Sequence, residues 1–128
     1  MIVDSSAVVA VLKEELGFEE LEQRMLEADV LAIGAPTLVE VVTVMARANG
    51  RDGLAVVSRF VRDLEMVVVP FDEPHAEAAA EAFLGFGKGR HPAALNYGDC
   101  MTYATARRAG RPLLFIGDDF SRTDIEAA

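Results

Sequence analysis

Acidic residues stand at four points where apolar segments end or are interrupted, and their type and spacing are suited to chemistry. One follows the opening apolar triplet, one interrupts the apolar run 38–45, one opens an otherwise uncharged helical segment, and a pair follows the apolar run 113–116: Asp4, Glu40, Asp99 and Asp118-Asp119. Hard divalent cations prefer carboxylate oxygens, so acids without a histidine suit Mg²⁺ or Mn²⁺ better than zinc. We expect a carboxylate cluster that holds Mg²⁺, with Mn²⁺ as a substitute.

Most of these acids also have an ordinary structural explanation. Asp4 can cap a helix, and Asp99 is favourably placed in the first turn of one. The pair Asp118-Asp119 after Gly117 is typical of a turn. The placement of all the acids at such junctions favours a metal site. The spacing leaves open which of Asp118 and Asp119 faces the ion.

Glu40 lies in a segment so apolar that we expect its helix to be mostly buried. An unpaired carboxylate in a buried position is costly, and a bound cation would remove that cost. The alternative is a solvated stripe of Glu40, Thr43 and Arg47, because these residues are spaced three and seven apart on a helix.

Carboxylate-bound cations are suited to phosphodiester hydrolysis. One or two such ions can activate water, bind the scissile phosphate and stabilise the leaving oxygen. No other group offers a convincing nucleophile or base. The single cysteine, Cys100, lies among apolar residues and is expected to behave as a small hydrophobe, and His91 lacks the serine or second histidine that a histidine-based mechanism needs.

Short apolar strands alternate with helices along the chain. Apolar or β-branched runs predict strands at residues 1–3, 30–33, 67–69 and 113–116. Helical spacing, capping residues and Gly or Pro punctuation predict helices at about 7–12, 18–28, 37–48, 52–64, 73–86 and 99–108, the first capped by Ser5 or Ser6. A last turn or short helix is expected near Ser121.

This alternation predicts one α/β domain over residues 1–128, with three α/β/α layers and a short-stranded central parallel sheet covered on both faces. In such sheets the functional site lies beyond the carboxyl ends of the strands. Asp4 and Asp118 each follow a strand, so they are expected to converge at one edge of the sheet although they are far apart in sequence.

The overall charge argues against some functions. A formal net charge of −9 is unlike that of proteins that bind nucleic acid by neutralising many phosphates, although a metal site can reverse the local field. No apolar run approaches the roughly 20 residues that a membrane span needs, and the start of the chain does not look like a secretion signal. We therefore expect a cytoplasmic protein that does not bind membranes.

Four motifs, in order, resemble those of the PIN-domain ribonucleases, and within them the VapC-type toxins of bacterial type II toxin–antitoxin pairs. The matching stretches are 1–7, 36–41, 95–104 and 113–125. The resemblance implies metal-ligating or metal-positioning roles for Asp4, Glu40 and Asp99, with Asp4 and Asp99 touching Mg²⁺ directly. It places the fourth acid at Asp118 or Asp119. It also suggests a polar role beside the first acid for Ser5 or Ser6.

The resemblance further implies an Mg²⁺-dependent endoribonuclease toxin that inhibits growth. Such proteins are generally homodimers, and a cognate VapB-type antitoxin inhibits them, often by placing a basic residue in the acidic pocket. Lys88 and Arg90, in the glycine-rich segment 85–92, are candidates for contacts with RNA phosphates; a solvated connection is the alternative.

Two other classes of protein remain as alternatives. A receiver-like regulatory domain also places acids and Mg²⁺ at strand ends, but it needs an acidic pair after the first strand and a lysine after a late one. Here the pair follows the last strand, and no lysine follows Asp119. A catalytically silent binding module on a PIN scaffold is the second alternative, which the presence of all four acids disfavours.

Overall fold

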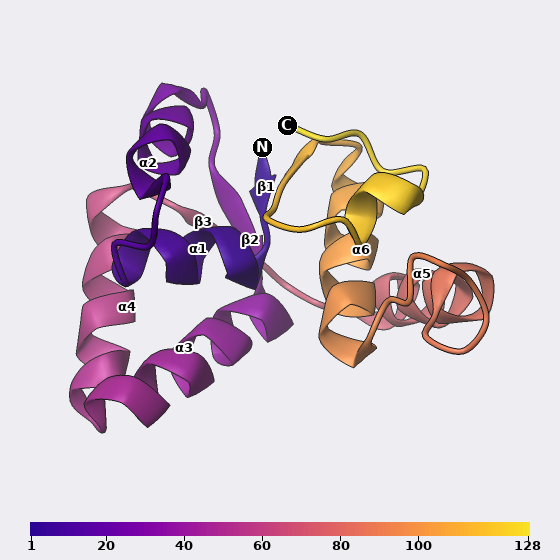
Figure 1. Ribbon diagram of the computed structural model, residues 1–128, viewed down its shortest axis with the longest axis horizontal. Helices are drawn as coiled ribbons and strands as arrows, with labels where there is room; N and C mark the ends of the chain where they lie inside the picture. The colour runs from indigo at the N-terminus through magenta and orange to yellow at the C-terminus, as the bar shows by residue number, and fades with distance from the viewer.

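A computed structural model describes residues 1–128 and shows a parallel four-stranded sheet with strand order β3-β2-β1-β4 (Figure 1). The strands are very short because polar or glycine residues follow most of these apolar runs closely. Their bounds are β1 Ile2–Val3, β2 Ala32–Gly34, β3 Val67–Val69 and β4 Leu113–Leu114.

Helices cover the two faces of this sheet, which confirms the predicted three-layer arrangement. On one side, at the left of Figure 1, are α1 Ser5–Leu12, α2 Phe18–Glu27, α3 Ala35–Asn49 and α4 Asp52–Asp63. On the other side are α5 Glu73–Phe86 and α6 Tyr97–Ala109, followed after β4 by a 3₁₀ turn, η1 Phe120–Arg122. No helix combines the length and the apolar character that crossing a bilayer would require.

Successive residues of each strand face opposite layers, as the pleat of a strand demands. Ile2, Ala32 and Leu113 pack into the cluster shared with α5 and α6. Val3, Ile33 and Leu114 pack into the cluster shared with α1 to α4. Because these residues are paired in register across the strands, each cluster receives one row of side chains from the sheet.

The predicted helices form, but two expectations were wrong: the burial of α3 and the length of the last strand. Helix α3 is not mostly buried: only Thr37, Val41 and Met45 are buried, and Val39 is 65 % exposed. The last strand is also shorter than expected, since β1 offers only Ile2 and Val3 as partners for it. Beyond that length, Phe115 and Ile116 have no strand to pair with.

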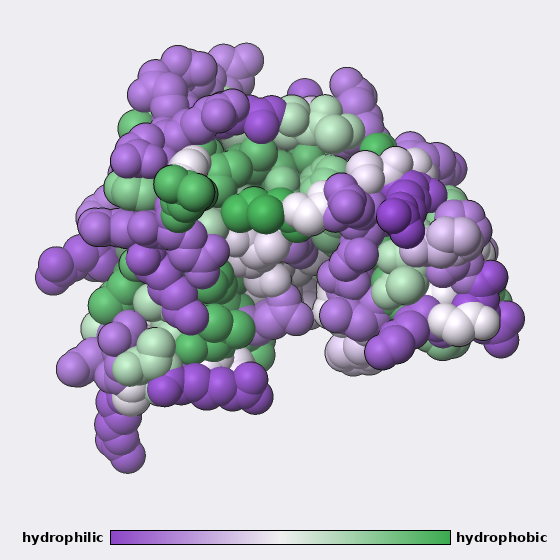
Figure 2. All heavy atoms as spheres, viewed as in Figure 1, coloured by the Kyte–Doolittle hydropathy of each residue, from purple (hydrophilic) through white to green (hydrophobic).

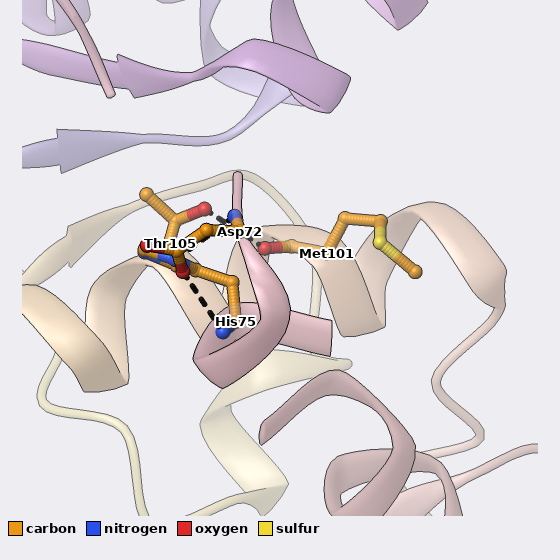
Figure 3. Close-up of polar contacts among 4 residues, drawn as sticks. All are labelled: Asp72, His75, Met101 and Thr105. Atoms are coloured by element: carbon orange, nitrogen blue, oxygen red, sulfur yellow. Dashed lines mark hydrogen bonds and ion pairs between the residues drawn. The ribbon is translucent and has the colours of Figure 1, made fainter. Parts of the chain in front are cut away.

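The helix pair α5–α6 packs through small residues, which include Ala79 and Ala82 on α5 and Ala104 on α6. Helix α5 begins with a capping box between Asp72 and His75, in which each side chain accepts from the backbone amide of the other. The Asp72 carboxylate and the His75 ring also contact each other at 2.6 Å (Figure 3). This hydrogen bond with His75 lowers the pKa of Asp72. Local chemistry thus defines where the helix starts.

The order of the strands places a topological switch point between β1 and β4. The chain builds β1, β2 and β3 outward in one direction, then crosses through α5 and α6 to place β4 on the other side of β1. In parallel α/β sheets, the gap between strands whose connections leave in opposite directions is where ligands bind. Asp4 follows β1, and the segment 115–119 follows β4, so both lie at this gap.

Candidate acidic active site

Asp4 is the most firmly held acid. It caps α1, is only 5 % exposed, and accepts hydrogen bonds at Oδ2 from the amide (3.0 Å) and the hydroxyl (2.6 Å) of Ser6. Its other oxygen, Oδ1, accepts from the Thr102 hydroxyl at 2.9 Å. Of the possible caps for this helix, Asp4 takes the role and Ser5 and Ser6 do not, because its carboxylate, two residues before Ser6, reaches the free amide of Ser6.

Asp99 is held in a different way, at the third position of α6. Its carboxylate accepts from the Asn96 amide at 2.9 Å, while its own amide donates to the Asn96 side chain at 2.8 Å. Burial raises the pKa of Asp99 to about 6, and the nearby carboxylates of Asp4, Asp119 and Glu40 add to the shift against the opposing Asn96 hydrogen bond. Nearby negative charges disfavour the ionised form of a carboxyl group, so it releases its proton only at a higher pH.

Glu40 reaches this cluster from α3. Its side chain lies against Gly98 at the start of α6, so closely that a Cβ atom at position 98 would clash with Oε2 of Glu40. Glu40 is only partly buried, so the cost of complete burial does not by itself argue for a cation there. What brings it to the site is the absence of a side chain at Gly98.

The pair Asp118-Asp119 lies in the turn after β4. The Asp119 carboxylate is one of the charges that raise the pKa of Asp99. The backbone carbonyl of Asp118 accepts a hydrogen bond from the Ser121 hydroxyl at 2.6 Å, which closes the turn before η1. Just before this turn, the Ile116 amide donates to the Ser6 hydroxyl at 3.1 Å, which ties the segment after β4 to the residues that hold Asp4.

Asp4, Glu40, Asp99 and Asp119 therefore gather from four segments, and none of them forms an ion pair with Lys, Arg or His. In Figure 2 the lower edge of the molecule is hollowed between the side built by α3 and α4 and the side built by α5 and α6. No three acid, thiol or imidazole groups stand close enough together to form a ready-made metal cage. The donor set still fits Mg²⁺, which is commonly held by one or two carboxylates, with water and phosphate oxygens as the other ligands.

Two site residues were missed from the sequence, Thr102 and Thr37. Thr102 donates to Asp4, and its hydroxyl contacts that of Thr37 at 2.9 Å. The position of Thr102, three residues after Asp99, puts both on one face of α6 and was the available signal. A threonine in an apolar helix has too many ordinary explanations for that signal to stand out.

Other candidates lie apart from the acids. Lys88 and Arg90 are exposed and form no hydrogen bond or ion pair with the cluster through their side chains, and the Arg90 guanidinium lies 5.7 Å from the centre of the Phe83 ring. Cys100 is buried, and burial together with the charge of Asp99 raises the pKa of its thiol. A protonated, buried thiol is a poor nucleophile, so Cys100 serves as a packing residue.

The parallel sheet and the acids at its carboxyl edge define a class of protein: the chain belongs to the PIN domain family, whose pattern it matches over residues 1–126. Within that family it resembles the VapC ribonucleases. It is 43 % identical to Ribonuclease VapC36 of Mycobacterium tuberculosis over 127 residues, covering 98 % of this chain and 91 % of the relative. It is 40 % identical to Ribonuclease VapC42 of the same species over 129 residues, covering 100 % of this chain and 98 % of the relative.

Solved structures agree on the fold. The crystal structure of M. tuberculosis VapC20, described as a sarcin-ricin loop cleaving toxin, superposes with a TM-score of 0.81 at 16 % identity, covering 99 % of this chain and 97 % of that one. The DNA-bound VapBC complex of Salmonella typhimurium gives a TM-score of 0.78 at 18 % identity, covering 98 % and 93 %. At these identities the likeness establishes a shared architecture.

Proposed function

We propose that this protein is an Mg²⁺-dependent endoribonuclease toxin of a toxin–antitoxin pair, with Mn²⁺ able to replace Mg²⁺. The observation that carries the proposal is a group of four carboxylates without an ion-pair partner, Asp99 and the three around it, in a chain that resembles the VapC ribonucleases. Charges of one sign, gathered at a strand edge without a basic partner, favour the binding of a cation. The RNA on which it acts is expected in the cytoplasm.

The chain's own residues have distinct roles in the proposed reaction. Asp4 and Asp99 would hold the cation, Asp119 would add negative charge to the site, and Glu40 would orient the attacking water and accept its proton. When bound, the ion would supply Lewis-acid stabilisation of the phosphodiester and promote ionisation of water. Hydrolysis would form one P–O bond to the water oxygen and break the P–O bond to the leaving ribose oxygen, which would take up a proton from solvent water.

The test is cleavage of mixed cellular RNA by the purified protein in Mg²⁺, Mn²⁺ or EDTA, beside the variants Asp4→Asn and Asp99→Asn checked for folding by circular dichroism. We expect metal-dependent cleavage that both variants lose. Cleavage that survives both substitutions would rule out this site. Metal binding by a wild-type protein that cuts no RNA, ribosomal RNA included, would favour the silent binding module.

An antitoxin is the proposed protein partner, and the VapBC complexes among the solved structures support it. A groove of about 530 Å³ between α1, α2 and α4 is suited to an amphipathic basic segment, because its apolar floor is flanked by three acids and only one basic residue. The apolar residues include Leu12, Val56, Phe60 and Leu64, the acids are Glu22, Asp52 and Asp63, and the basic residue is Arg59. A basic side chain from the same partner would offset the four carboxylates. Expression of the toxin alone should arrest growth, and co-expression of the VapB-type antitoxin should restore it.

A homodimer is proposed from a second groove. About 460 Å³ between α5 and α6 is lined only by apolar side chains, among them Phe83 and the 80 % exposed Tyr97. A second copy of this chain would remove that surface from water. Light scattering should give twice the mass of the chain, and Phe83→Asp should give the mass of one chain. Leu16→Asp, at an exposed site outside the groove, should stay dimeric.

A further inference from the structure

We propose that Thr37 and Thr102 form a buried hydroxyl relay that positions the carboxylate of Asp4. The geometry of the relay stands on its own, and its consequence for catalysis rests on the proposed function. Both threonines are buried, Thr102 at 1 % and Thr37 at 3 % exposure. They join α3 to α6 and, through Asp4, to the end of β1.

The direction of the hydrogen bonds follows from what each group can donate. A carboxylate only accepts, so Thr102 must donate its single hydroxyl proton to Oδ1 of Asp4, 2.9 Å away. The Thr102 oxygen then has only lone pairs to offer, so Thr37 is the donor in the 2.9 Å contact between the two hydroxyls. The order is therefore Thr37 to Thr102 to Asp4.

Other threonines in the same structure show that this arrangement is not the default. Within a helix, a threonine hydroxyl usually donates to the carbonyl of the residue four before it. Thr43 does so on α3, to Val39 at 2.9 Å. Thr105 does so on α6, to Met101 at 3.0 Å (Figure 3). Thr102, one turn before Thr105, instead directs its hydroxyl out of the helix to an acid 98 residues away in sequence.

The relay determines which electron pairs of Asp4 remain free. Ser6 occupies Oδ2 with two donors, and Thr102 occupies one side of Oδ1. Together these donors prevent rotation of the carboxylate, so its remaining lone pairs keep one direction. Thr37 secures Thr102 in turn, because without that donor the Thr102 side chain would be freer to adopt the ordinary helical contact. Both threonines are thus positioning residues for a cation bound at Asp4.

The experiment measures Mn²⁺ binding without RNA, by the electron paramagnetic resonance signal of free Mn²⁺. Thr102→Val keeps the shape of the side chain and removes the hydroxyl; we expect about 10-fold weaker binding, the size typical of losing a partner of a metal ligand. Thr102→Ser should restore affinity to within about threefold of wild type, because it returns the donor. Thr105→Val is the matched control on the same buried face and should leave Mn²⁺ affinity unchanged.

A double-mutant cycle tests whether the two threonines act in series. Thr37→Val alone should weaken Mn²⁺ binding by a smaller factor, about threefold. In a protein that already carries Thr102→Val, the same change should add nothing, because its only route to Asp4 is gone. Equal effects of Thr37→Val in both backgrounds would overturn the relay.

A metal-free readout separates this inference from the proposed function. The ¹³C resonance of the Asp4 carboxyl group should move in Thr102→Val and in Thr37→Val, return toward wild type in Thr102→Ser, and stay in place in Thr105→Val. If Asp4 does not respond to Thr102→Val, the relay is wrong whatever the protein cleaves. A relay seen in Mn²⁺ affinity and in this resonance, in a protein that cuts no RNA, would refute only the ribonuclease proposal.

Discussion

The two aspartates proposed to hold the ion occupy opposite environments. Asp4, at the end of β1, is buried and receives three hydrogen bonds, two from Ser6 and one from Thr102. Asp99, at the start of α6, receives one from Asn96 and faces the carboxylates of Asp4, Asp119 and Glu40. The charge of Asp4 is stabilised by hydrogen bonds, whereas the charge of Asp99 is destabilised, first by burial and then by the neighbouring carboxylates.

This difference suggests a division of work within the site. The hydrogen bonds on Asp4 cost nothing at the moment of binding because they already exist, which is what a preorganised ligand requires. The repulsion at Asp99 is relieved only when positive charge arrives. Either a cation or a basic side chain of an antitoxin would relieve it, so the same repulsion would favour both activity and inhibition. Such stored strain is a common cost of function to stability.

The largest test of this comparison replaces each aspartate by asparagine. We expect both Asp4→Asn and Asp99→Asn to lower RNA cleavage at least roughly 100-fold, because each removes a charged ligand. In EDTA at pH 8, however, the variants should differ in the sign of their stability change. Asp4→Asn should lose about 1–3 kcal/mol, because an amide group would face hydrogen-bond donors.

Asp99→Asn should instead be more stable than wild type by the order of 1 kcal/mol, because the cost of burying a charge and the like-charge repulsion both disappear while the Asn96 amide keeps an acceptor. Urea unfolding of the metal-free proteins measures both changes. A loss of stability in both variants would show that the hydrogen bonds of Asp99 outweigh its repulsion, and the proposed contrast would fail.

Gly98→Ala tests how Glu40 joins the two aspartates. The added Cβ would displace the Glu40 carboxylate, which is the mobile end of a side chain, so the fold should tolerate the change. We expect RNA cleavage to fall roughly 10- to 100-fold, as small displacements of a catalytic group can cause, with stability altered by less than about 1 kcal/mol.

The control is Gly85→Ala on α5, where the new methyl group meets nothing within 4 Å. It should cleave RNA as wild type does, and its stability should differ from that of wild type by less than about 1 kcal/mol. Normal cleavage by Gly98→Ala would mean that Glu40 is not needed where this structure places it.

The dependence of stability on pH offers a sharper measure of the strain at Asp99. Its pKa is raised to about 6, so between about pH 4 and 6 the native protein keeps a proton that the unfolded chain has released. Stability must therefore fall as pH rises across this range, by the order of 1 kcal/mol because Asp99 is partly screened by water.

The measurement is the difference in unfolding free energy between wild type and Asp99→Asn at several pH values, in EDTA. That difference isolates Asp99 from carboxylates that act in the opposite direction, such as Asp72, whose pKa is lowered. The asparagine variant should gain on wild type as pH rises from about 4 to 6, with no further gain above that range, and saturating Mn²⁺ in place of EDTA should abolish the gain. A constant difference would show that Asp99 titrates normally.

Much of this arrangement could be predicted from local sequence. The predicted helix 73–86 is α5 to the residue, because an alanine-rich run lies between a capping aspartate and a glycine. Asp4 was placed correctly at a strand end because apolar residues stop there abruptly. Both features depend on neighbours in the chain, which sequence patterns describe well.

What could not be predicted depends on distant contacts. The exposure of Val39 follows from the side of α3 that contacts α1, α4 and α6, and the apolar run around Val39 gives no sign of which side that is. The approach of Asp119 to Asp99 joins the turn after β4 to the start of α6, two segments about 20 residues apart. The hydroxyl of Thr102 meets an acid 98 residues earlier, a pairing that no local pattern records.

The smallest predicted effect concerns the glycine-rich segment 85–92, away from the two aspartates. If Lys88 and Arg90 contact RNA phosphates, the double substitution to alanine should raise KM a few-fold and reduce the salt dependence of RNA binding, without changing Mn²⁺ affinity or stability. This would separate substrate binding from the two acids, since neither basic side chain forms a hydrogen bond or ion pair with them. An unchanged KM and salt slope would make the segment 85–92 a solvated connection, and a changed Mn²⁺ affinity would show that its charge reaches the acidic site after all.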